Sequence, residues 1–245
     1  MKFTVVGSGA MGLRYGVLLQ DAGNEVDFVD GWKPNVEKMR EQGGVYVSRD
    51  HKDKHLVPVN VYYPEEYDGN PDCYIFFLKQ MQLSDMLKRC EHFFKPNQYA
   101  FTCMNGMGHV EKLLKYFKPE KLVAGTALVA TVLNGPGDVD FIGKRGAGSM
   151  NLANYTEKPD DFTHKLVEQL EKAQFNPNLT TNFRGTLMAK VVFNSVVNTL
   201  CTMFEMTMGE YADYDGADEM SQQLIDEAYD VCERDGVQML NTRKQ

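Results

Sequence analysis

Apolar residues in the first part of the chain switch between short continuous runs and helical spacings. Phe3–Val6 reads as a buried strand, and a glycine turn and an amphipathic segment over 11–19 follow it. A second apolar run, Val26–Val29, follows Ala22-Gly23. This order of strand, glycine turn, helix and strand predicts a βαβ unit.

The alternation continues far beyond this unit. Pro34–Gln42 has helical spacing and stops at Gly43-Gly44, and Cys73–Leu78 is an apolar run typical of a strand covered on both faces. Further elements are expected as short strands over 45–63, a helix over 83–94, a strand over 99–103, antiparallel strands over 122–155 and a helix over 160–173. The fold class predicted is α/β, a Rossmann-type doubly wound parallel sheet.

The pattern changes after a cluster of Asn and Thr residues near Thr180–Arg184. Residues 186–204 are nearly all apolar and predict one helix, and a further helix is expected over 218–234. We therefore expect a dinucleotide-binding domain over residues 1–182 and a shortened, all-helical second domain over residues 183–245.

Composition narrows the class of protein. Hydrophobic residues make up 43% of the 245 residues, and 34 acidic against 26 basic residues give a net charge of −8, which argues against nucleic acid or an anionic membrane as partner. The five cysteines form no C-x-x-C pair, so neither a disulfide framework nor a metal site is indicated. No signal peptide or membrane-spanning run is recognisable, and a cytoplasmic protein is expected.

The first turn carries the fingerprint G-x-G-x-x-G. Gly7 allows the tight turn, Gly9 lets backbone approach a pyrophosphate, and Gly12 lets the helix pack close to the strand. The pyrophosphate would sit at the helix N-terminus, where unpaired N–H groups point outward. The remaining residues of the predicted cofactor loop are Ser8, Ala10 and Met11.

Asp30 ends the second strand of the unit. A carboxylate there accepts hydrogen bonds from the adenosine ribose of NAD and repels the 2′-phosphate of NADP, so NAD is the expected cofactor and NADP the less favoured one. An acid after a strand is also often only a helix cap, and Lys33 stands near enough in sequence to meet a phosphate. NADP therefore stays an alternative.

Two later strands also end on polar groups. Lys79 follows the run Cys73–Leu78, and Asn105-Gly106 follows the strand expected over 99–103. Ligands of open α/β sheets bind beyond the carboxyl ends of the strands, so these residues are placed to touch a cofactor.

The helix expected over 186–204 carries a polar line of Lys190, Asn194 and Asn198. On an α-helix this i, i+4, i+8 spacing stacks the three about 6 Å apart along one face, drifting by roughly 40° at each step. A solvated helix face is the alternative, but Asn is a poor residue for the middle of a helix. A buried lysine and two carboxamides would suit a polar substrate.

Together, the GSGAMG turn, Lys79, the Asn105-Gly-Met-Gly motif and the K-x-x-x-N-x-x-x-N helix resemble the ketopantoate reductase (2-dehydropantoate 2-reductase) family over essentially the whole chain. The resemblance implies that Lys190 is the catalytic general acid, that Asn194 and Asn198 hold the substrate, that Asn105 lies between nicotinamide and substrate, and that Lys79 contacts the cofactor. It implies reduction of a 2-oxo acid to a D-2-hydroxy acid by NAD(P)H. The family includes NAD-dependent dehydrogenases similar to D-mandelate dehydrogenase, and Asp30 leans toward that branch.

The chain departs from the family pattern at its end. Family members continue past the helix near Arg234 with a serine and a glutamate that reach the substrate, and no equivalent follows here. An NAD(H)-binding protein without catalysis is therefore the alternative function, and a homodimer is possible because an apolar helix face would be exposed. A third interpretation is a β-hydroxyacid or sugar-phosphate dehydrogenase. A phosphorylated substrate would call for an arginine cluster, which the second half of the sequence does not show.

Overall fold

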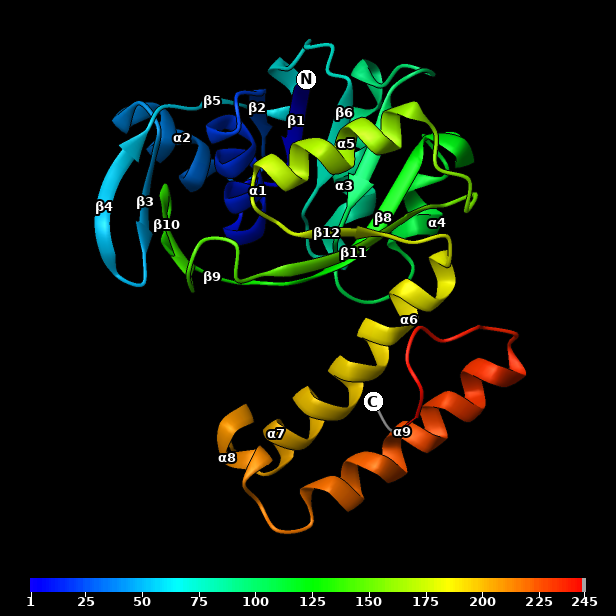
Figure 1. Cartoon of the computed structure of the whole chain (residues 1–245). Coiled ribbons are helices and arrows are strands. Elements are labelled where there is room, and N and C mark those ends of the chain that lie inside the picture. Colours follow the sequence, from blue (N-terminus) through cyan, green and yellow to red (C-terminus); the bar gives the residue numbers. More distant parts are fainter. Residues whose placement is uncertain (244–245) are drawn as a thin grey trace.

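The computed structural model describes residues 1–243 and consists of an α/β domain with a helical arm below it (Figure 1). The predicted Rossmann-type α/β fold with a helical second part is confirmed. Residues 244 and 245, the last two of the predicted second domain, lie outside the described residues. The boundary placed between residues 182 and 183 stays a prediction, and α6 begins at that point.

The α/β domain is built on an eight-stranded sheet. Its strands, in order across the sheet, are β12 (Pro177–Leu179), β11 (Ser149–Asn154), β8 (Leu122–Leu128), β7 (Tyr99–Thr102), β6 (Cys73–Phe76), β1 (Lys2–Val6), β2 (Glu25–Val29) and β5 (Asn60–Tyr62). The pairs from β5 through β8 are parallel, and β11 runs antiparallel to β8. Because the chain passes from β1 outward to β2 and later to β6 on the other side of β1, the strand order reverses between β1 and β6.

Helices cover both faces of this sheet. One core cluster joins α1 (Ala10–Asp21), α2 (Lys33–Gln42) and α5 (Asp161–Lys172) to the strands. The opposite cluster brings in α3 (Gln80–Cys90) and α4 (His109–Leu113). Short 3-10 turns complete the domain at η1 (Pro64–Glu66), η2 (Glu91–Phe93) and η3 (Pro119–Lys121). Coverage on both faces explains why β6 reads as a continuous apolar run.

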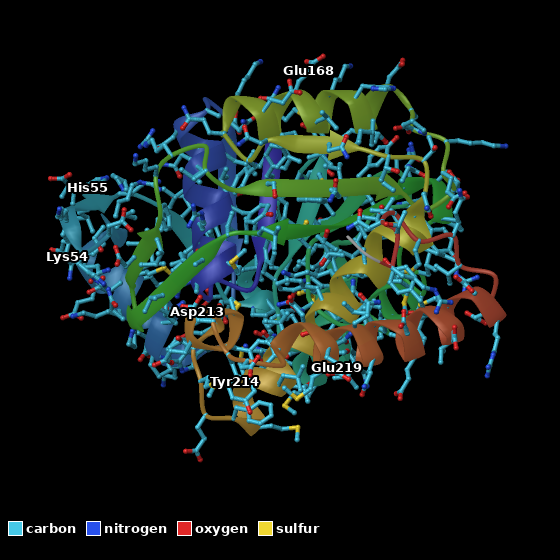
Figure 2. The ribbon with its side chains drawn as sticks, turned by 60° about the horizontal axis from the view of Figure 1, so that its bottom comes forward. Lys54, His55, Glu168, Asp213, Tyr214 and Glu219 are labelled. Carbon is cyan, nitrogen blue, oxygen red and sulfur yellow. The ribbon has the colours of Figure 1, made fainter. Side chains whose placement is uncertain are left out.

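A second sheet stands beside the first and was not expected. It has four strands in the order β4 (Lys52–Val57), β3 (Val45–Arg49), β10 (Asp138–Ile142) and β9 (Ala130–Gly135). β3 and β10 pair in parallel, with Tyr46 opposite Asp138. The strands expected over 45–63 and 122–155 are therefore divided between the two sheets. Figure 2 shows Lys54 and His55 at the outer edge of this second sheet, far from α5, which carries Glu168.

The helical part consists of α6 (Phe183–Phe193), η4 (Asn194–Asn198), α7 (Thr199–Met203), α8 (Met208–Ala212) and α9 (Ala217–Arg234). Its own core joins Val196 and Leu200 to Tyr229 and Cys232 of α9. The expectation of one α-helix over 186–204 is wrong in its middle, because residues 194–198 form a π-helix. Among the described residues, no helix is long and apolar enough to span a membrane.

Candidate functional site

A cavity of about 610 Å³ opens where the strand order reverses. Turns that follow β1, β2, β6 and β7 form its walls, together with one face of α3. Its lining residues are Gly7, Gly9, Ala10, Met11, Asp30, Gly31, Trp32, Phe77, Leu78, Lys79, Gln80, Gln82, Asp85, Met86, Arg89, Cys103, Met104 and Asn105. A crevice beyond the carboxyl ends of parallel strands at such a point is the usual ligand site of open α/β sheets.

The three glycines of the first turn differ in what surrounds them. Gly7 has φ +99°, and a Cβ there would lie 2.3 Å from the Phe77 carbonyl oxygen. A Cβ on Gly12 would lie 1.8 Å from the Gly7 carbonyl oxygen, whereas one on Gly9 would meet nothing within 4 Å. Protein packing thus requires Gly7 and Gly12, and Gly9 faces open cavity. α1 begins there, and no side chain among the described residues caps it, so its first N–H groups are available to an anion.

Asp30 is buried, with 7% of its surface exposed, and it braces the glycine turn. Its Oδ2 accepts hydrogen bonds from the Ser8 N–H and the Ser8 hydroxyl, both at 2.6 Å, and its Oδ1 accepts one from the Trp32 N–H at 2.8 Å. A carboxylate offers about four acceptor positions in all, so Oδ1 keeps one for a ribose hydroxyl.

Sequence reasoning missed the residue behind this turn. Asn35 is fully buried on α2, and its amide donates to the Ser8 carbonyl oxygen and hydroxyl, both at 2.9 Å. Its Oδ1 accepts from the Gly137 N–H at 2.8 Å, which ties the glycine turn to the hairpin of the second sheet. Nothing local in the sequence distinguishes this asparagine from a surface helix residue. Ser8 and Gly12, both predicted cofactor residues, are buried behind the cavity wall.

Lys79 and Asn105 are exposed on the cavity rim, Lys79 at the start of α3 and Asn105 after β7. Gly106 follows with φ +86° and is not among the described residues that line the cavity. The structure thus brings Gly7, Gly9, Ala10, Met11, Asp30, Lys79 and Asn105 together around one cavity.

A polar network fixes the loop that carries Asn105. The Gln80 amide donates to the Met107 carbonyl oxygen and lies 3.4 Å from His109 Nδ1, and Lys112 Nζ donates to the Gln80 carbonyl oxygen at 2.8 Å. His109 is fully buried, and burial lowers the pKa of His109. The network joins the start of α3 to the loop over 105–108, and so it fixes the position of Lys79 relative to Asn105.

The second predicted constellation lies on the helical part of the chain. Lys190 is half-buried on α6 with its Nζ 5.0 Å from the centre of the Phe193 ring, and burial lowers the pKa of Lys190. Asn194 and Asn198 begin and end the π-helix, and Asn198 is exposed. Lys190 lies on α6 and both asparagines on the π-helix, so the three residues span a junction between two kinds of helical turn. None of the three is among the described residues that line the cavity.

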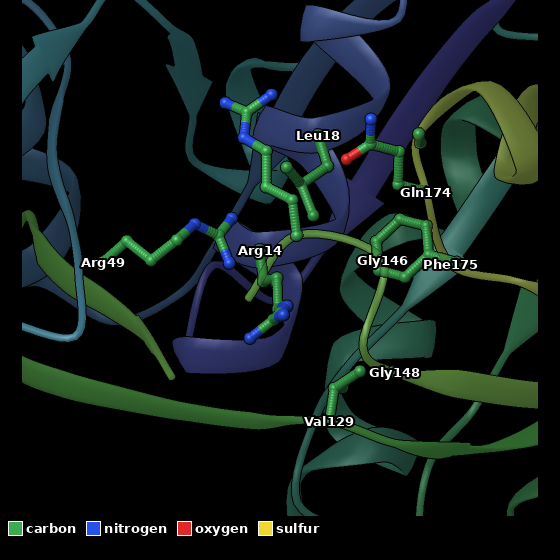
Figure 3. A pocket seen from close by; sticks show the side chains of 10 residues that line it. Arg14, Leu18, Arg49, Val129, Gly146, Gly148, Gln174 and Phe175 are labelled. Carbon is green, nitrogen blue, oxygen red and sulfur yellow. The ribbon is translucent and has the colours of Figure 1, made fainter. Parts of the chain in front are cut away.

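A second, smaller hollow lies between α1 and the second sheet (Figure 3). Arg14, Arg49 and Arg145 line it. Arg14 donates to the carbonyl oxygens of Ala130 at 2.6 Å and Ile142 at 3.3 Å, and Arg145 Nη2 lies 3.5 Å from Asp21. Burial lowers the pKa of Arg14 and of Arg49, and each also has a neighbouring arginine that lowers its pKa. These contacts fasten the second sheet to α1, away from the glycine turn.

Comparison with known proteins agrees with this geometry. A family model described as "Ketopantoate reductase PanE/ApbA" matches residues 3–156, and the model of its C-terminal part matches residues 182–245. The chain is 27% identical to a 2-dehydropantoate 2-reductase of Lactococcus lactis over 242 residues, which is 98% of this chain and 76% of the relative. A 2-dehydropantoate 2-reductase of Streptococcus pyogenes is 28% identical over 240 residues, again 98% and 76%.

Solved structures include a close match. The ternary structure of D-mandelate dehydrogenase with NADH and anilino(oxo)acetate superposes with a TM-score of 0.89 and 28% identity, and the match covers 98% of this chain and 76% of that one.

Proposed function

The chain belongs to the ketopantoate reductase family of oxidoreductases, and on that premise we propose that it reduces a 2-oxo acid to a D-2-hydroxy acid with NADH. The observation that carries the proposal is the cavity at the reversal of strand order, where the glycine turn, Asp30, Lys79 and Asn105 meet. Its size of about 610 Å³ falls in the usual range for a cofactor site.

These residues suggest how the cofactor would lie along the cavity. The pyrophosphate would lie at Gly9 and the N-terminus of α1, where the backbone is open and the N–H groups point outward. The free acceptor position on Asp30 Oδ1 would take a hydroxyl of the adenosine ribose, which favours NADH over NADPH. The nicotinamide would lie toward Asn105, and Lys79 would contact the cofactor near the same end of the cavity.

When bound, the nicotinamide supplies the hydride that reduces the substrate. As the carbonyl carbon receives it, negative charge builds on the carbonyl oxygen. The Lys190 ammonium would stabilise this charge and then give its proton to the oxygen, while Asn194 and Asn198 would hold the polar groups of the substrate. The balanced reaction is 2-oxo acid, NADH and one proton giving the 2-hydroxy acid and NAD⁺.

The substrate is proposed as ketopantoate or a bulky 2-oxo acid such as phenylglyoxylate. Relatives named 2-dehydropantoate 2-reductase support the first, and the structural likeness to a D-mandelate dehydrogenase supports the second.

The test is a steady-state assay that follows NADH absorbance with a panel of ketopantoate, phenylglyoxylate and branched 2-oxo acids, repeated with NADPH. We expect turnover with at least one acid and its loss in Lys190→Ala. The control is Lys165→Ala, which removes an exposed lysine from α5. NADH binding without turnover of any acid would overturn the proposal and leave a nucleotide-binding protein without catalysis.

A further inference from the structure

The cavity is lined by a basic residue, Arg89, that the dinucleotide assignment does not use. Gln82, Asp85, Met86 and Arg89 all line the cavity and lie on one face of α3, since they are spaced by three or four residues. Arg89 follows Lys79 by ten residues, about 15 Å of helix. Arg89 therefore lies at the adenosine end, beside Asp30, when Lys79 and Asn105 mark the nicotinamide end.

Because Gly31 has no side chain, the Arg89 side chain can lie against the backbone that follows Asp30. A Cβ on Gly31 would lie 2.5 Å from Arg89 Nη1 and 3.1 Å from Met86 Cε. Any side chain at position 31 would displace the guanidinium. Arg89 Nη1 thus lies against Gly31, the residue that follows Asp30, and the Asp30 carboxylate is the group proposed to hold the adenosine ribose.

Glu65 holds the other side of the same guanidinium. Arg89 Nε donates to Glu65 Oε1 at 2.7 Å and Arg89 Nη2 donates to Glu65 Oε2 at 3.1 Å, a bidentate pair between α3 and η1. This pairing lowers the pKa of Glu65 and raises the pKa of Arg89, so both groups are charged at neutral pH. Two of the three guanidinium nitrogens are therefore committed to a carboxylate.

The charges at this end are mostly negative. Asp30 and Asp85 line the cavity, and Glu65 lies behind Arg89. Lys33, the other cation near in sequence, lies 3.5 Å from Glu37 and is not among the described residues that line the cavity. A 2′-phosphate entering here would meet carboxylates and a guanidinium that is already paired.

We propose that the Glu65–Arg89 pair is a specificity element that makes this site select NADH, because Glu65 keeps Arg89 from acting as a 2′-phosphate ligand. This inference rests on the proposed function, since it takes the cavity as the dinucleotide site. When Glu65 loses its charge, no carboxylate holds Arg89 Nε and Nη2, and the guanidinium can turn toward a 2′-phosphate on the ribose. A guanidinium is well suited to bind phosphate through two hydrogen bonds.

The test measures dissociation constants for NADH and NADPH by fluorescence titration. In Glu65→Gln we expect NADPH affinity to rise by about tenfold, with NADH affinity changed by less than about twofold, because new charge-assisted hydrogen bonds serve the phosphate alone. In the double variant Glu65→Gln/Arg89→Met the gain in NADPH affinity is expected to vanish.

The matched control is Glu66→Gln. Glu66 lies on the same 3-10 turn as Glu65 but pairs with Arg40 instead of Arg89. Its substitution by Gln removes the same charge. An equal gain in Glu66→Gln, or an unchanged ratio of NADPH to NADH affinity in Glu65→Gln, would overturn the inference while NADH binding still stands. If the folded wild-type protein binds neither dinucleotide, the proposed function and this inference both fail. Thermal unfolding of each variant verifies that it is folded.

Discussion

Gly9 and Gly12 lie three residues apart, and the same change to alanine should have different consequences at the two positions. We expect Gly12→Ala to lower stability and Gly9→Ala to weaken NADH binding. In Gly12→Ala the new Cβ would lie 1.8 Å from the Gly7 carbonyl oxygen, short of the ordinary 3.4 Å contact by about 1.6 Å. The clash is with backbone of the cofactor turn, which a rotamer change cannot relieve. Overpacking of this kind costs about 3 kcal/mol or more, and better helix propensity offsets about 1 kcal/mol, so we expect at least about 2 kcal/mol of destabilisation.

In Gly9→Ala the Cβ meets nothing within 4 Å, and the backbone at φ −73° and ψ −171° is open to alanine. The gain from a less flexible unfolded chain, about 0.4–1 kcal/mol, nearly balances the weaker N-cap preference of alanine, so stability should change by less than about 0.5 kcal/mol. The methyl group would instead occupy the space proposed for the pyrophosphate, and NADH affinity should fall by at least about tenfold.

Urea denaturation and NADH fluorescence titration separate the two effects, and each variant serves as the control for the other. Wild-type NADH affinity in a folded Gly9→Ala protein would refute the placement of the pyrophosphate at Gly9. Wild-type stability of Gly12→Ala would refute the packing argument for the turn.

Three further predictions concern buried polar groups. Asn35→Leu removes three hydrogen bonds and leaves the Gly137 N–H and the Ser8 oxygens without this partner, so the free energy of unfolding in urea should fall by about 2–4 kcal/mol; a loss below about 1 kcal/mol would contradict the bracing role. The turnover rate should decline as pH rises through the pKa of Lys190, which burial lowers from 10.5, and Lys190→Arg should move that decline to higher pH; an unmoved profile would exclude Lys190 as the acid. Because burial lowers the pKa of His109 from 6.5, the unfolded chain binds this proton more readily, and the free energy of unfolding should decrease as pH falls below 6.5. His109→Leu should flatten that dependence, whereas His164→Leu, an exposed change on α5, should leave it; equal profiles in both variants would contradict this account.

Local patterns carried the prediction of the dinucleotide fold. The strand over Lys2–Val6, its glycine turn and the helix that follows lie within one stretch of chain, and their periodicities depend on nearby residues alone. The apolar run Cys73–Phe76 revealed a covered parallel strand for the same reason.

The features that sequence reasoning missed depend on distant residues. β3 and β10 pair across about 90 residues of chain, and Asn35 reaches from α2 to Gly137. Neither contact leaves a periodicity in the sequence. His109 follows a glycine-rich stretch, and it is fully buried at the start of α4, which packs against α3.

The polar residues on α6 and η4 show a different reason why sequence patterns can fail. Lys190, Asn194 and Asn198 keep a strict four-residue spacing, which gave no sign that residues 194–198 form a π-helix. The spacing identified the three residues but assumed a regular α-helix, and their roles stay predictions.

The most direct measurement is the transfer of an isotope from cofactor to product. The protein would be incubated with NADH deuterated at the transferring position of nicotinamide C4 and with each 2-oxo acid of the panel, and the 2-hydroxy acid would be analysed by mass spectrometry and chiral chromatography. We predict one deuterium at C2 of a D-2-hydroxy acid, and none when Lys190→Ala replaces the wild-type protein. A wild-type protein that binds NADH but yields no deuterated product from any of the acids would contradict this prediction.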